Sequence, residues 1–197
     1  MASGFDDDTP LSKHWHETFD EIFQAFSPDE WKLEPTDRNM PTEWRRFKDG
    51  AKVMFICDCG NSWTSMRGIV IFWFNKIGES ERKEEVKTNA ETEKNNEGKD
   101  GEHCEGEASS KNTIHQYSLR FKVYGQQCQR CDDEKFQNPE WYKEEVTKVL
   151  KNVHQKIGEV FYHFPSKKPD DKKRHGRPRR PHDSKRCQAC SEGHCSK

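Results

Sequence analysis

Hydrophobic side chains recur along the chain with changing periods, and each period predicts a different element. Between residues 10 and 26 the apolar positions are three or four apart, which is typical of an amphipathic helix: Trp15, Phe19, Ile22, Phe23 and Phe26. Ser27-Pro28 predicts the end of this helix, because a residue that precedes proline is disfavoured in the helical conformation. Residues 31–47 carry apolar side chains without a period, together with two prolines, so we expect an irregular or short-helical connection there.

Alternating polar and apolar residues then predict β-strands. The strand signal over residues 51–57 leads to a turn at Gly60-Asn61, and residues 63–74 return as a second strand. Residues 117–123 alternate in the same way and predict a third strand. After Asn138-Pro139 a helical period returns, at Tyr142, Val146, Val149, Val153, Ile157 and Val160. This stripe predicts a long C-terminal amphipathic helix that packs on the sheet.

Seven of the eight cysteines fall into three short clusters that follow these elements. The clusters are Cys57 with Cys59, Cys128 with Cys131, and Cys187 with Cys190 and Cys195. Two thiolates separated by two residues can bind one zinc ion, which takes four ligands in a tetrahedron. We therefore expect an α+β fold: an antiparallel sheet stapled by zinc at metal knuckles, covered by the N-terminal helix and the long C-terminal helix.

Composition sets the limits of the folded region. Hydrophobic residues make up 30% of the chain and charged residues 35%, which is too few apolar side chains to order the whole length. We expect residues 1–10 to be an acidic disordered N-terminus, and residues 11–197 to be one zinc-binding domain interrupted by a disordered insertion at 79–112. Cys104 lies in that insertion, and we interpret it as a free thiol. No secretory signal or transmembrane segment is evident, so we expect a cytoplasmic protein whose thiols stay reduced.

The candidate donors suit two zinc ions. They are the seven clustered cysteines and one histidine, His182, five residues before Cys187. One zinc ion, with His182 as a bystander, remains an alternative, and a redox-active Cys-x-x-Cys pair is another. The Cys57-x-Cys59 spacing requires a sharp bend at Gly60, because alternate residues of a flat strand are too far apart to chelate easily. Closed thiolate sites leave no position for water, so we expect structural zinc, and no catalytic motif indicates an enzyme.

The segment 172–180 is strongly basic. Arg174, Arg177, Arg179 and Arg180 surround a Gly-Arg-Pro core, similar to arms that enter the minor groove of DNA. These arginines are candidates for binding nucleic acid or an anionic surface such as lipid, while a solvated basic loop is the simpler interpretation. In a nucleic-acid function, aromatic side chains such as Trp63 or Tyr124 would stack on bases.

The arrangement of the clusters resembles the receptor-transporting protein family, whose shared domain is the 3CxxC-type zinc finger. The matching stretches are Trp44-Arg45-Arg46-Phe47, Phe55-Ile56-Cys57-Asp58-Cys59, Trp63-Thr64-Ser65, Val123 to Cys131, Pro181-His182, and Cys187 to Cys195. Two departures stand out. The first family cluster is usually Cys-x-x-Cys, and several relatives end in a transmembrane segment that this chain lacks.

This resemblance implies a non-enzymatic accessory role. Family members promote the trafficking and cell-surface expression of odorant and bitter-taste G-protein-coupled receptors, so the implied partners are such receptors and no small-molecule substrate. The implied location is peripheral to the endoplasmic reticulum and plasma membrane. One branch of the family resembles interferon-linked antiviral RNA-binding proteins, which makes RNA the alternative partner.

Overall fold

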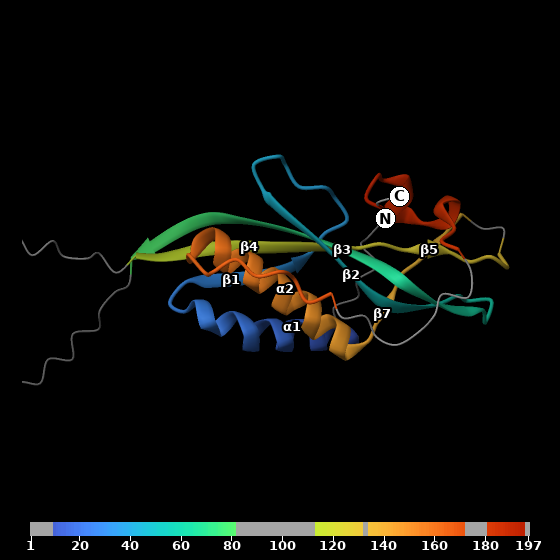
Figure 1. The fold of residues 1–197 in the computed structure, drawn as a ribbon, viewed down its shortest axis with the longest axis horizontal. Coiled ribbons are helices and arrows are strands. Elements are labelled where there is room, and N and C mark those ends of the chain that lie inside the picture. Colours follow the sequence, from blue (N-terminus) through green and yellow to red (C-terminus); the bar gives the residue numbers. More distant parts are fainter. Residues whose placement is uncertain (1–9, 82–112, 132–133, 172–180, 196–197) are drawn as a thin grey trace, which may run out of the picture.

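The computed structural model describes residues 10–81, 113–131, 134–171 and 181–195, which form a mixed α+β fold (Figure 1). The main sheet has five strands in the order β1-β4-β3-β2-β7. These strands are β1 (Glu30–Pro35), β2 (Arg45–Ile56), β3 (Ser62–Glu81), β4 (Thr113–Val123) and β7 (Glu140–Trp141). A separate two-stranded ribbon pairs β5 (Gln126–Gln127) with β6 (Phe136–Gln137). The expected α+β class is confirmed, and the sheet is mostly antiparallel.

The helices follow the predicted periods with shifted ends. Helix α1 (Pro10–Phe23) continues into the 3₁₀ turn η1 (Gln24–Phe26) and stops before Ser27, as the proline predicts. Helix α2 (Lys143–Phe161) begins later than the Asn138-Pro139 signal. The cause is β7, whose two residues pair with Val53 and Met54 of β2 before the helix starts. Near the C-terminal end, the 3₁₀ turn η2 (Ser184–Arg186) precedes the short helix α3 (Gln188–Ser191).

The sheet is buried on both faces, and the apolar run in β3 shows how. Val70, Phe72 and Phe74 belong to one core cluster, while the alternate residues Ile71 and Trp73 belong to another. Alternate residues of a strand point to opposite faces, which explains why this strand is a continuous apolar run. The first cluster also contains the apolar stripes of α1 and α2, and the second contains Tyr124, Cys187 and Ala189. In Figure 1 the two long helices run side by side, away from α3.

Two sequence-based expectations about the sheet were wrong. Residues 31–47 include strand β1 and the start of β2, where we expected an irregular connection. Strand β1 also pairs with β4 in parallel, with Leu33 opposite Leu119, so the sheet is not wholly antiparallel. Leu33 is the single fully buried residue of this short strand, and its other side chains are charged, part-buried or proline. A strand that depends on pairing with a distant segment has little local signal.

The boundary of the insertion was also misplaced. Strand β3 continues through residues 79–81, which pair with residues 113–115 of β4. Glu79 there forms an ion pair with Lys76, and its carboxylate lies 3.6 Å from the His115 ring Nδ1. This end of the β3–β4 hairpin is held by backbone pairing and exposed charges. The pattern of apolar side chains in the sequence therefore does not predict that the strand continues this far. The rest of the predicted insertion, Cys104 included, and residues 1–9 of the predicted N-terminal segment lie outside the described residues.

Within the described ranges, no helix has the length and apolar character needed to cross a membrane.

Candidate metal centres

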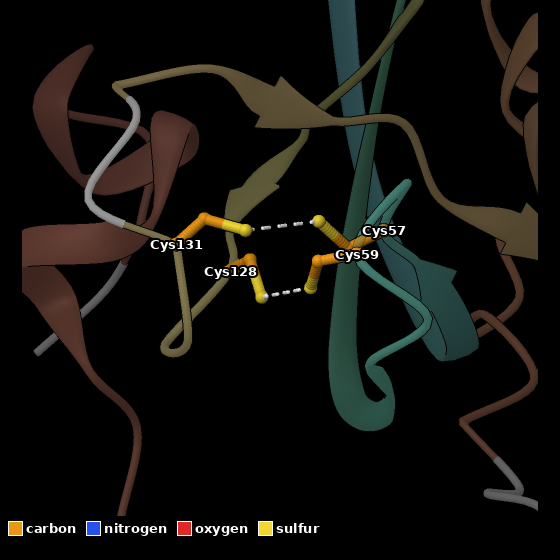
Figure 2. Close-up of side chains that lie close together, drawn as sticks. All are labelled: Cys57, Cys59, Cys128 and Cys131. Carbon is orange, nitrogen blue, oxygen red and sulfur yellow. Dashed lines mark hydrogen bonds between the residues drawn. The ribbon is translucent and has the colours of Figure 1, made fainter.

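The first donor group lies where the tip of the β2–β3 hairpin meets the segment after β5. Figure 2 shows the sulfur atoms of Cys57 and Cys59, from the hairpin tip, directed toward those of Cys128 and Cys131. Cys57 Sγ lies 3.5 Å from Cys131 Sγ, and Cys59 Sγ lies 3.8 Å from Cys128 Sγ. All four sulfur atoms lie within 4.8 Å of one another. Zn–S bonds of about 2.3 Å in a tetrahedron place sulfur atoms about 3.8 Å apart, so the group has the dimensions of a zinc site.

The short Cys57-x-Cys59 spacing works because the hairpin tip is a tight turn. The Gly60 N–H donates to the Cys57 carbonyl at 2.8 Å, and the Cys57 N–H donates to the Asn61 carbonyl at 2.9 Å. Gly60 has φ +80°, in the left-handed region where glycine carries no steric penalty. The expected bend at Gly60 is therefore confirmed, and it brings both thiols to one side of the tip.

Hydrogen bonds to sulfur distinguish the thiols of this group. Desolvation acts to raise the pKa of Cys128, but hydrogen bonds from the Arg130 N–H and the Asn61 side-chain amide outweigh it and lower the pKa to about 6. Hydrogen bonding with Cys59 and Cys57 raises the pKa of Cys131. A bound divalent cation would replace the protons shared among these sulfur atoms, since metal binding requires thiolates. Asn61 was not among the predicted site residues. Its position directly after the turn glycine was the one feature of the sequence that could have indicated a side chain beside the thiols.

The second donor group is local in sequence. His182 Nε2 lies 3.1 Å from Cys190 Sγ, Cys187 Sγ lies 3.8 Å from Cys195 Sγ, and the four donor atoms all lie within 4.8 Å of one another. Helix α3 starts after Cys187, and the turn after it ends at Gly193, where φ is +74°. Burial raises the pKa of Cys187 and that of Cys195, the latter to about 12. Three thiols and an imidazole packed this closely can bind one cation, because the cation displaces the thiol protons.

The second group is fastened to the sheet by backbone pairing. Gln188 N–H donates to the Gly125 carbonyl at 3.1 Å, and the Gly125 N–H donates to the Gln188 side chain at 2.9 Å. Gly125 also allows β6 to approach closely, because a Cβ atom there would lie 2.7 Å from the Gln137 carbonyl oxygen. Gln126 and Cys187 form an isolated β-bridge beside this contact. The second donor group is therefore held by the connection between β4 and β5, which lies just before Cys128 of the first group.

Side chains strengthen the attachment of the second group. Lys122 on β4 donates to both carboxylate oxygens of Glu192, and its ammonium lies 5.0 Å from the centre of the Tyr124 ring. His194 stands edge-on to the same ring, accepts a 3.1 Å hydrogen bond from Arg46 at Nδ1, and accepts one from Lys48 at its carbonyl. Sequence reasoning missed Lys122 and Glu192, because each belongs to a polar stretch that gives no sign of a long-range pair.

The structure brings all eight predicted donors into two groups of four and not into one. The arginines of the basic segment, Arg174, Arg177, Arg179 and Arg180, lie outside the described residues. The suggestion that Tyr124 stacks on bases was wrong, since its ring is buried beneath the second donor group. Trp63 is part-buried, with its ring stacked on Phe55 and its indole N–H donated to Gln126 at 2.8 Å.

Comparisons with known proteins agree with this chemistry. Residues 102–193 match a zinc-binding domain of the zinc-ribbon 3CxxC type. Over 97% of its length the chain is 22% identical to receptor-transporting protein 3 of Mus musculus, of which the match spans 35%. Over 92% of its length it is 22% identical to receptor-transporting protein 4 of Homo sapiens, of which the match spans 63%. The chain thus spans about a third of the length of the mouse protein and somewhat under two thirds of the length of the human protein. No solved structure matches it.

The donor atoms and the matched domain together identify zinc as the cofactor. The two relatives are named for transporting receptors, and each match covers more than nine tenths of this chain. The chain's resemblance to the receptor-transporting protein family, with its 3CxxC-type zinc-binding domain, is thereby confirmed.

Proposed function

We propose that this protein is a zinc-stabilised accessory protein that binds receptors and promotes their delivery to the cell surface, with odorant and bitter-taste G-protein-coupled receptors as clients. The observation that carries the proposal is the similarity to two receptor-transporting proteins across more than nine tenths of the chain, in a fold that brings together two groups of zinc donors. The protein acts at the cytoplasmic side of the endoplasmic reticulum and plasma membrane, as a peripheral partner of its clients. Its role is binding and not chemical conversion, so no small-molecule substrate is part of it.

The proposed ligands are Cys57, Cys59, Cys128 and Cys131 for one zinc ion, and His182, Cys187, Cys190 and Cys195 for the other. Zinc bound by four protein donors supplies structural cross-links and leaves no position for a reacting water molecule. In the first group it ties the hairpin tip to the segment after β5. In the second it cross-links α3 with the turns on either side of it. The protein surface between the groups is thereby kept in one shape, which lowers the entropic cost of binding a partner.

The test is the surface delivery of a panel of chemosensory receptors in cells with and without this protein, measured by antibody binding to intact cells. The Cys128→Ser, Cys131→Ser double variant removes two proposed ligands, and Cys104→Ser is the matched cysteine control. We expect a rise in surface receptor with the wild type and the control, and none with the double variant. A double variant that delivers receptors as well as the wild type contradicts the zinc-dependent role.

RNA binding is the alternative that the same experiment must exclude. If surface delivery does not rise for any receptor while the purified protein binds RNA with a steep dependence on salt, the accessory role is wrong and nucleic acid is the partner. Salt dependence is the signature to look for, because each phosphate contact releases a bound counterion.

A further inference from the structure

A groove of about 1490 Å³ borders both donor groups, and neither proposed zinc ion accounts for it. Its lining includes Asn61 and Ser62 at the hairpin tip, beside the first group, and also His182 of the second group with its neighbour Asp183. Residues of β2 and β3 line it as well. The groove is thus built on segments that the donor groups hold in place, so its shape depends on them.

The charge of the groove is positive. Arg67, Arg130 and Arg186 line it together with Lys52, against one carboxylate, Asp183. That carboxylate lies 3.8 Å from a guanidinium nitrogen of Arg186, so its charge is largely offset. Arg67 and Arg130 are exposed, and neither forms an ion pair with a carboxylate of the described residues. Two guanidinium groups are therefore available, and guanidinium binds carboxylate or phosphate through paired hydrogen bonds.

The uncharged lining suits the backbone of an extended peptide. Gln126, Gln127 and Gln129 line one side, and their amides can both donate and accept hydrogen bonds. The hydroxyl groups of Ser62, Thr64 and Ser65 do the same on the side of β3. Met54 and Met66 add flexible apolar surface, which adapts to side chains of different shape. The lining combines groups for a peptide backbone, for carboxylates and for small apolar side chains.

The same lining is poorly suited to single-stranded nucleic acid. Such ligands are bound by stacking successive bases on aromatic rings. Among the described residues that line the groove, the aromatic rings are those of Trp63 and the proposed ligand His182, and Trp63 is part-buried, with its ring stacked on Phe55 at a centroid distance of 5.2 Å. Its indole N–H is already donated to Gln126. The positive groove lacks a run of stacking platforms, so carboxylates fit it better than a nucleotide chain.

We propose that this groove binds an extended acidic peptide segment of a partner protein, with Arg67 and Arg130 pairing with its carboxylates. The proposal rests on the proposed accessory function, for which it names the chemistry of the client segment. A client with an acidic loop is drawn to the groove by charge and held by backbone hydrogen bonds to the glutamine and hydroxyl side chains.

The test measures binding of fluorescein-labelled probes to the zinc-loaded full chain by fluorescence anisotropy. The probes are a 12-residue peptide of alternating Glu and Ala, the same peptide with Gln for Glu, and a 12-nucleotide oligouridylate RNA. The groove variant is Arg67→Glu with Arg130→Glu. The matched control is Arg38→Glu with Lys151→Glu, which reverses two exposed charges outside the groove. Arg67→Glu alone is a second groove variant that leaves the Cys128 to Cys131 turn intact, and zinc content is measured for every variant.

We expect the Glu-Ala peptide to bind the wild type and the control equally, and the groove double variant about tenfold more weakly, since each exposed charge pair contributes modestly. The Gln-Ala peptide should bind weakly throughout. Equal binding of the Glu-Ala and Gln-Ala peptides, equal binding by the groove and control variants, or tight binding of the RNA in their place overturns the proposal.

The outcome separates the groove from the accessory role. If the groove variants lose the acidic peptide and the wild type still fails to raise surface receptor, the groove assignment stands and the accessory function is wrong. If the groove variants keep full surface delivery and peptide binding is unaffected, the groove assignment is wrong and the accessory function stands.

Discussion

The ammonium of Lys122 donates hydrogen bonds of 2.9 and 2.8 Å to the two carboxylate oxygens of Glu192, and so joins the sheet to the C-terminal donor group. The Lys122 side chain is only 10% exposed and that of Glu192 28%, so water competes weakly for either charge. A buried lysine without its partner is far less favourable than a lysine in water. The position of the second donor group therefore depends on this pair.

Glu192→Ala should lower the free energy of unfolding by about 2 kcal/mol, because it leaves the Lys122 charge buried and unpaired. Lys122→Met combined with Glu192→Ala should cost less than Glu192→Ala alone. Urea denaturation at a fixed concentration of free zinc measures both, with Glu30→Ala as a control for loss of an exposed acidic residue. Additive losses in the double variant would show that the two side chains do not interact.

Zinc content should be two ions per chain. Cys128→Ala and Cys190→Ala should each lower it to about one, because the two groups share no ligand. Cys104→Ala should leave it at two. Inductively coupled plasma mass spectrometry of protein dialysed against a weak chelator gives these values. A single zinc ion in the wild type would contradict the assignment of two centres and favour the one-zinc alternative.

His182 is the proposed ligand that the sequence left most open, and the structure places its Nε2 3.1 Å from Cys190 Sγ. His182→Cys should keep cobalt bound in the second group and increase the sulfur-to-cobalt charge-transfer absorption, since a thiolate replaces an imidazole. His182→Ala should weaken cobalt binding at this group about tenfold or more. Identical spectra for His182→Cys and the wild type would mean that this histidine is not a ligand.

His154 should make the protein sensitive to mild acid. Its ring stacks on Phe26 at a centroid distance of 4.3 Å, and burial lowers its pKa. Since the folded pKa lies below the unfolded value of about 6.5, the stability from the neutral ring is fully present above pH 6.5 and is lost as the pH falls from that value through the lower folded pKa. The loss at pH 6.0 is at most about 0.8 kcal/mol.

Thermal melts at pH 7.5 and 6.0 test this, with His154→Phe as the variant. The melting temperature of the wild type should fall more between the two pH values than that of His154→Phe. Any loss of zinc with acid is common to both proteins, so only the difference between them reports on His154. Equal falls would show that His154 titrates alike in the folded and unfolded states.

The strands β3 and β4 should accept a direct connection. Glu81 and Thr113 are paired in the sheet, so their backbones are close enough for a two-residue hairpin turn. Replacing residues 82–112 with Asn-Gly should raise the free energy of unfolding by about 2 kcal/mol, because a shorter loop costs less entropy to close. Chemical denaturation measures the change, and replacement by a Gly-Ser linker of the original length is the control. A marked loss of stability would show that residues 82–112 contribute contacts.

The elements predicted correctly are those whose signal is local. The period of Trp15, Phe19 and Phe23 marks α1, and the alternation of Val53 and Phe55 marks β2, because each side chain is buried as its neighbours in sequence imply. Strand β1 gave no such signal, since its pairing with β4 is parallel and joins residues far apart in the chain. The start of α2 was misplaced because Trp141 is recruited to the sheet before the helix begins.

The donor residues were evident from spacing, but their partners were not. Nothing in the sequence pairs Cys57 with Cys131, or shows that His182 joins Cys187, Cys190 and Cys195 and not the earlier cysteines. The Lys122–Glu192 pair and the groove could not be predicted from the sequence either, because each forms only when the C-terminal segment packs on the sheet.

The two proposed centres differ in the time that passes between the synthesis of their first and last ligands. Cys59 and Cys128, whose sulfur atoms lie 3.8 Å apart, are separated by 69 positions in the chain, whereas His182 and Cys190 are separated by 8. At about 5–20 residues per second, the hairpin thiols wait roughly 3–14 s for their partners during synthesis. In that interval the nascent chain carries Cys57 and Cys59 without the other two donors of the group, so these two thiols can bind another metal or be oxidised. The second centre passes through no comparable interval, so errors in metal loading should concentrate at the first.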